Sequence, residues 1–138
     1  MAKKDRTLYV LKYLWKNTDE YHPATVSDIL AALENENIKV ERHALMSDIE
    51  QLTEFGIDIV CVKSSPNKYF IGQRSFELPE LKLLVDAVES SRFISASQSS
   101  SLVSKLYDMA SLHQASELNR HLYVGRQSEK RQQNALLY

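Results

Sequence analysis

The stretch Val40–Gly56, VERHALMSDIEQLTEFG, is the part of this sequence that most constrains the fold. Leu45, Ile49 and Leu52 recur at i, i+4 and i+7, so they share one face of a helix. Gly56 supplies the left-handed residue at which such a helix ends. Polar side chains crowd the first turns on the other faces. We therefore expect an amphipathic helix that packs on a core through one face and presents polar first turns.

Two more helical patterns precede this stretch. Residues Arg6–Asn17 predict a first helix, and Asp5 is expected to be its N-cap. Thr25 begins a second helix, TVSDILAALE, and the spacing of Thr25 and Asp28 resembles a capping box. The first helix is expected to pack through Leu8, Leu11, Leu14 and Trp15, and the second through Val26, Ile29, Leu30 and Leu33.

Beyond Gly56 the pattern changes from helical to extended. Ile57, Ile59 and Cys61 alternate with other residues in a β-branched run, SSPN forms a turn, and KYFI returns before Gly72. The order helix, helix, helix, hairpin is that of a winged helix-turn-helix domain, although other small α+β units share it. In such a domain the second and third helices contact DNA and the hairpin is the wing.

The second half of the chain is mainly helical by pattern. Pro79 suits the first turn of a helix that extends to Arg92. Further helices are expected over 97–111 and about 113–119, and a short strand over 121–124. The apolar face of one helix consists of Leu81, Leu84, Val85 and Val88. That of the next consists of Leu102, Leu106 and Met109, and it is widened by Val103, Tyr107 and Ala110. We therefore divide the chain into residues 1–74 and a helical region, residues 75–138.

Composition excludes several classes of protein. No apolar run approaches the roughly 18 residues that span a bilayer, and no signal-peptide pattern is present, so we expect no membrane partner and a cytoplasmic protein. The four histidines and one cysteine show no metal-binding spacing, and the three glycines form no phosphate-binding loop. The serine-rich run 95–101 has no glycine elbow. We therefore expect no enzyme, no cofactor and no metal site.

Net charge gives no support to nucleic-acid binding. The formal net charge is −1, and residues 1–72 contain nine Lys and Arg against eleven Asp and Glu. Residues 73–138 contain eight against seven. If the chain binds DNA, its positive charges must therefore be sorted onto one surface.

Longer segments resemble a known family. The segment VERHALMSDIEQLTEFGIDI, followed by a hairpin ending in KYFIG, resembles the N-terminal domain of bacterial transcriptional regulators that contain a WYL domain. The segments FELPELKLLVDAVESSRFIS and LVSKLYDMASLHQASELNRHLYV resemble the helical linker that follows it. The resemblance implies a DNA-binding regulator fragment that ends about where the effector-binding WYL domain begins, so an effector ligand would bind that missing domain.

Three residues of the expected recognition helix, residues 41–55, depart from the family pattern. Glu41 stands where the family tends to have Ser, Met46 where it has an aromatic residue, and Ser47 where it has Arg. Loss of that Arg removes a phosphate contact. Glu41 favours the helix dipole but repels phosphate unless it accepts a hydrogen bond from a cytosine amino group.

Candidate DNA contacts follow from this assignment, each with a structural alternative. The recognition helix would contact the major groove, whereas the wing, residues 57–71, would contact the backbone. A hydroxyl at the start of the second helix would meet a phosphate there, or would only cap the helix. The alternative for the remaining side chains is an ordinary solvated surface. The complete candidate set is Thr25, Arg42, His43, Met46, Ser47, Lys63, Asn67 and Lys68.

The sequence is compatible with two functions. The first is a DNA-binding transcriptional regulator whose partner is double-stranded DNA. The second is a protein–protein interaction module on the same scaffold with little affinity for DNA, which the near-neutral charge and Ser47 favour. The broad apolar faces of the helical region also predict a homodimer formed through residues 76–124. The alternative is a monomer in which the tail covers these faces itself.

Overall fold

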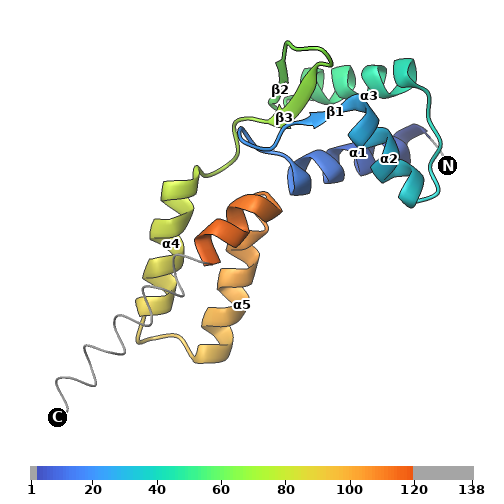
Figure 1. Cartoon of the computed structure of the whole chain (residues 1–138). Coiled ribbons are helices and arrows are strands. Elements are labelled where there is room, and N and C mark those ends of the chain that lie inside the picture. The colour runs from blue at the N-terminus through green and yellow to red at the C-terminus, as the bar shows by residue number, and fades with distance from the viewer. Residues whose placement is uncertain (1–2, 120–138) are drawn as a thin grey trace. The chain divides into compact units, whose positions relative to one another are not determined.

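The structure is a computed structural model that describes residues 3–119 (Figure 1). It is mainly helical and contains a small three-stranded antiparallel sheet. The chain divides into two compact units, Met1–Ser75 and Phe76–Tyr138, called here the N-terminal unit and the C-terminal unit. The expected strand over residues 121–124 lies outside the described residues.

Three helices form most of the N-terminal unit. They are α1 (Lys3–Asn17), α2 (Val26–Asn35) and α3 (Arg42–Phe55). The predicted capping box of α2 is confirmed, because the Thr25 hydroxyl accepts from the Asp28 N–H and the Asp28 carboxylate accepts from the Thr25 N–H. Gly56 adopts a φ of 122° directly after α3, and its N–H donates to Leu52 and Thr53, so the predicted glycine stop is also confirmed.

The sheet contains one strand more than the hairpin that the sequence indicates. The strands β2 (Ile59–Val62) and β3 (Lys68–Ile71) form the predicted hairpin. A two-residue strand, β1 (Ala24–Thr25), pairs with the other edge of β3, so the strand order is β1-β3-β2. Thr25 is therefore both the last residue of β1 and the N-cap of α2. This pairing fixes the start of α2 to the part of β3 that directly follows the hairpin loop.

The core of the N-terminal unit is formed by all three helices and the sheet. Its fully or nearly fully buried side chains include Val10, Leu14, Ile29, Leu33, Leu45, Ile49, Leu52 and Ile71. The apolar face predicted for α3 is thus the buried one. Leu11 and Ile59, both predicted as core, are half-buried and pack against this cluster, and Cys61 is half-buried as well.

A buried ion pair joins α1 to α3. Asp48 is completely buried, and Arg6 donates to it through Nε (2.6 Å to Oδ2) and Nη2 (3.0 Å to Oδ1). The Thr7 hydroxyl donates to the same carboxylate at 3.2 Å. Hydrogen bonding to Asp48 raises the pKa of Arg6 above its ordinary value. The polar pair therefore fixes the recognition-helix candidate α3 on α1 at the edge of the apolar core.

A second arginine fixes the end of the N-terminal unit. The Arg74 guanidinium lies 4.5 Å from the centroid of the Trp15 ring, and its Nη2 donates to the carbonyl oxygens of Trp15 and Thr18 at 2.8 and 2.7 Å. Burial lowers the pKa of Arg74 from its ordinary value. The chain that follows β3 is thereby anchored to the C-terminal end of α1.

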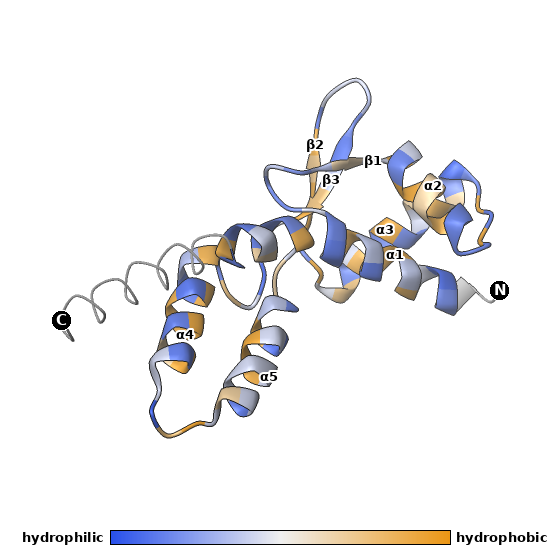
Figure 2. Cartoon of the chain, turned by 60° about the horizontal axis from the view of Figure 1, so that its bottom comes forward, coloured by the Kyte–Doolittle hydropathy of each residue, from blue (hydrophilic) through white to orange (hydrophobic). Residues whose placement is uncertain are grey.

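The C-terminal unit is built from paired helices. The helices α4 (Leu78–Ser90) and α5 (Ala96–Tyr107) pack side by side, and a further helix covers residues 112–119 (Figure 1). Pro79 lies in the first turn of α4 as predicted. Each helix alternates between hydrophobic and hydrophilic residues along its length (Figure 2). Leu81, Val85 and Val103 are buried, as are Ala110 and Leu118.

Four details of the expected helices are wrong. Helix α1 begins at Lys3, so Asp5 lies inside its first turn and is not its N-cap. Leu8 is 63% exposed, because Val10 and Leu14 form the buried face of α1. Leu102 is exposed, although Val103 and Ala110 of the same expected face are buried. Helix α5 also ends at Tyr107, before the expected residue 111, because Ser111 caps the next helix by bonding with Gln114.

Candidate nucleic-acid interface

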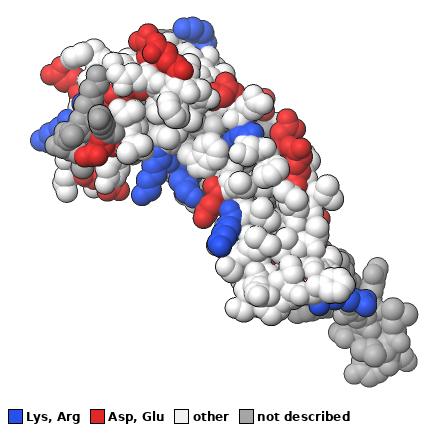
Figure 3. All heavy atoms as spheres, turned by 180° about the vertical axis from the view of Figure 1, so that it is seen from behind, with Lys and Arg blue, Asp and Glu red and all other residues white. Residues whose placement is uncertain are grey.

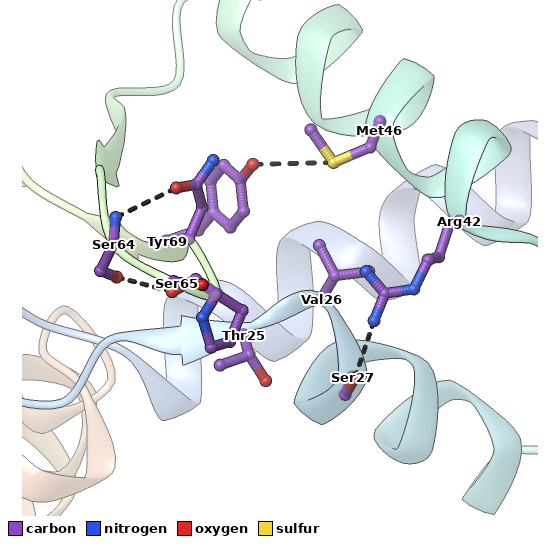
Figure 4. Close-up of a pocket in the computed structure, with 10 residues that line it drawn as sticks. Thr25, Val26, Ser27, Arg42, Met46, Ser64, Ser65 and Tyr69 are labelled. Atoms are coloured by element: carbon purple, nitrogen blue, oxygen red, sulfur yellow. Dashed lines mark hydrogen bonds between the residues drawn. The ribbon is translucent and has the colours of Figure 1, made fainter.

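A cleft of about 380 Å³ lies between the start of α2, the start of α3 and the tip of the β2–β3 hairpin (Figure 4). It brings together four of the candidate residues, Thr25, Arg42, Met46 and Asn67. These side chains come from three separate segments of the N-terminal unit. The other lining residues are Val26, Ser27, Ser64, Ser65, Pro66 and Tyr69.

Arg42 is the charged group of the cleft. It is the first residue of α3, is exposed, and its Nη2 donates to the Ser27 hydroxyl at 3.0 Å across the turn between α2 and α3 (Figure 4). An arginine guanidinium carries five N–H donors. Most of them remain directed at no described residue, so Arg42 retains the capacity for a bidentate contact with an acceptor pair.

Met46 lies one helical turn after Arg42 and is linked to the hairpin. The Tyr69 hydroxyl, on β3, lies 3.7 Å from the Met46 sulfur (Figure 4). Tyr69 is buried, and this burial raises the pKa of its phenol above the ordinary value. The contact holds the exposed first turns of α3 against β3 close to the hairpin loop.

The tip of the hairpin is closed by polar contacts. The Asn67 side-chain oxygen accepts from the Ser64 N–H at 3.1 Å, and the Ser64 hydroxyl donates to the Pro66 carbonyl at 2.6 Å. The Asn67 side chain also forms a hydrogen bond with the Tyr69 phenol, which lowers the pKa of that phenol and so opposes the effect of burial. A closed polar tip of this kind suits contact with a sugar–phosphate backbone.

Four candidate residues do not line the cleft: His43, Ser47, Lys63 and Lys68. His43 is exposed, and its Nδ1 lies 3.3 Å from the Glu41 carboxylate, the group immediately before α3. Lys68 is paired across the sheet with both Thr25 and Val62. Because side chains alternate along a strand, Lys68 projects to the face opposite Asn67 and Tyr69.

Most arginines of the N-terminal unit form contacts within its own fold. The N-terminal unit contains three arginines, and two of them, Arg6 and Arg74, are engaged in fixing its own fold. Arg42 is the exposed one. On the face of the molecule drawn in Figure 3, basic and acidic side chains are interspersed and no single sign dominates.

Ser27 and Tyr69 are two of the six lining residues outside the candidate set, and each contacts a candidate side chain. Ser27 is the second residue of α2, and nothing in the local sequence indicates that it meets Arg42, 15 residues later. Tyr69 follows Asn67 by two residues on a strand, which puts both side chains on one face. The third strand β1, which positions Thr25, had no signal of its own because two residues show no periodicity.

The described residues offer little evidence for other kinds of site. Within them, no group of three or more His, Cys, Asp and Glu side chains could hold a metal ion. No helix in this part of the chain has both the length and the apolar character required to cross a membrane. A smaller cleft of about 140 Å³ between α1 and α2 is lined by Tyr9, Lys12, Tyr13, Lys16, Asn17, Ala32, Leu33 and Glu36.

Comparison with known proteins identifies no relative of this chain. No protein-family model matches it, and neither a curated protein nor a solved structure does so.

Proposed function

We propose that this chain is the N-terminal part of a DNA-binding transcriptional regulator of the WYL-domain class. In this proposal the N-terminal unit is a winged helix-turn-helix, α3 enters the major groove, and the β2–β3 hairpin contacts the backbone as the wing. The C-terminal unit leads toward an effector-binding domain. The support comes from the geometry of the cleft and from the sequence resemblance described above.

The convergence of three segments on one cleft is the observation that carries the proposal. The start of α2, the first turn of α3 and the hairpin tip contribute Thr25, Arg42 and Asn67 to a common surface. These segments supply an exposed guanidinium for a base edge and polar groups for phosphate and sugar oxygens. The β1–β3 pairing holds the start of α2 beside the hairpin, so these segments are kept together as one surface.

Selection from a randomised duplex library, followed by titration with salt, tests the proposal. The unmutated chain should enrich a defined sequence and bind it more tightly than random duplex. Arg42→Ala should weaken binding to that sequence by about 1–3 kcal/mol. Equal affinity of the unmutated chain for the selected duplex and for random duplex would contradict specific recognition.

The second candidate function is a protein–protein interaction module, and one observation favours it. Large apolar side chains are exposed on the C-terminal unit, among them Leu83 at 70%, Phe93 at 98% and Leu112 at 58%. We propose that residues 76–124 associate with a second copy of the chain, which is compatible with either function. A dimer would present two recognition helices to two half-sites about one turn of DNA apart.

A further inference from the structure

The hydrogen bond between Arg42 and Ser27 is a polar link between the two helices of the proposed recognition motif. Both side chains are exposed, and the Arg42 Nη2 donates to the Ser27 Oγ at 3.0 Å. Ser27 itself is well positioned, because it lies within the Thr25–Asp28 capping box that fixes the first turn of α2. A flexible arginine is thus tied to a rigid point on the neighbouring helix.

The direction of this bond leaves a defined set of donors free. The Ser27 contact occupies one N–H of Nη2, so one parallel donor pair stays free whichever hydrogen is used, either Nη1 with Nη2 or Nε with Nη2. Two parallel donors match the O6 and N7 acceptors of guanine in the major groove. The other three bases do not present two adjacent acceptors there.

We propose that Ser27 is a positioning residue that holds Arg42 ready to contact a guanine in the major groove. The inference rests on the proposed function, and it goes beyond it by naming the base pair, G·C, and the residue that positions the side chain contacting it. Ser27 acts through Arg42 and touches no base. Ser27 orders the long Arg42 side chain before DNA binds. Without it, the entropy cost of ordering that side chain would reduce the binding free energy.

The size of the effect follows from this mechanism. Ordering one long side chain at an interface is worth about 0.5–1.5 kcal/mol, which corresponds to a loss of about 2- to 13-fold in affinity for Ser27→Ala. A bidentate arginine–guanine contact is worth about 1–3 kcal/mol, or about 5- to 150-fold for Arg42→Ala. Ser27→Ala should therefore be the milder change.

Affinities of the full chain for two duplexes test the proposal. One is the duplex selected by the unmutated chain, and the other differs only at the G·C pair whose replacement weakens binding most. Ser27→Ala should lose affinity for the first duplex and keep it for the second. In an Arg42→Ala background it should cost nothing further on either. Ser27→Thr keeps the hydroxyl and should behave as the unmutated chain, as should Ser100→Ala, a matched exposed helix serine on α5.

The outcomes separate a failure of the proposed function from a failure of the role of Ser27 alone. An unmutated chain without any base preference overturns the proposed function and this inference with it. An unmutated chain that prefers one sequence, combined with a Ser27→Ala variant that loses nothing or loses equally on both duplexes, overturns the inference alone. Thermal unfolding of each variant identifies any that fails to fold, and Ser27→Thr then remains as the test: it must keep the preference for guanine.

Discussion

Replacing Arg6 or Asp48 by alanine breaks the same buried ion pair, yet the two variants should lose different amounts of stability. The Asp48 side chain is completely buried, whereas 19% of the Arg6 side chain is exposed. Removing Arg6 leaves a carboxylate in the interior that still accepts a hydrogen bond from the Thr7 hydroxyl but has lost its charged partner. Removing Asp48 leaves a guanidinium that can turn toward water. The two alanine variants should therefore differ although they break the same bond.

The expected magnitudes follow from this difference in burial. Arg6→Ala should lower the free energy of unfolding by about 3–5 kcal/mol, the usual cost of leaving a buried charge unpaired. Asp48→Ala should cost about 1.5–3 kcal/mol, the value of a hydrogen bond to a charged group. The double variant should cost less than the sum of the two, because the second removal breaks no further bond.

Urea unfolding of the full chain measures these losses. Trp15 is the single tryptophan and lies in the N-terminal unit, so its fluorescence reports on that unit. Arg42→Ala is the matched control, because this arginine bonds only to an exposed serine, and its change should stay within about 0.5 kcal/mol. An Asp48→Ala variant that is less stable than Arg6→Ala, or an Arg6→Ala variant as stable as Arg42→Ala, would refute the reasoning.

Further predictions concern the core, the wing, the phenol and the assembly. Ile49→Ala should cost about 2–5 kcal/mol in urea unfolding, and a loss below about 1 kcal/mol would mean that Ile49 is not core. Lys68→Ala should weaken binding to all duplexes alike and lower the slope of affinity against salt by about one, whereas a sequence-dependent loss would make it a base contact. Because burial raises the pKa of Tyr69, its contribution to stability is full below the ordinary tyrosine pKa of about 10 and is lost as pH rises through the folded-state pKa. Tyr69→Phe should therefore reduce the loss of stability at alkaline pH, and an unchanged alkaline profile would contradict this. Sedimentation should show a dimer of the full chain and a monomer of residues 1–74, and a full chain that stays monomeric at high micromolar concentration would exclude the dimer.

Features that depend on neighbouring residues were predictable from the sequence. The α3 stripe of Leu45, Ile49 and Leu52, the Thr25 capping box and the Gly56 stop all express periodicity or local bonding, and the structure contains each of them. The predicted inward face of α5 contained both Leu102 and Val103, and only Val103 is buried. A broad apolar stripe leaves the rotation of a helix open, and packing against neighbouring helices decides it.

Features that depend on distant residues were not predictable. Asp48 lies beside Ile49 on α3, and nothing local indicates that it pairs with Arg6, 42 residues earlier. The same holds for Arg74, because nothing local indicates that it stacks on Trp15, 59 residues earlier. For the candidate site, helical position indicated Arg42, but its partner Ser27 could be identified only once α2 and α3 had been brought together.

The central position of β3 has a consequence for how this protein can diverge. Because β3 is paired on both edges, the alignment of Lys68 with Thr25 is fixed independently of the loop that joins β2 to β3. Residues can therefore be inserted or removed between Ser64 and Asn67 without shifting the frame on which α2 begins. That loop also lines the cleft. Changes in its length would alter which ligand the cleft accepts at little cost in folding, whereas a deletion within Lys68–Ile71 would displace both edges of the sheet at once.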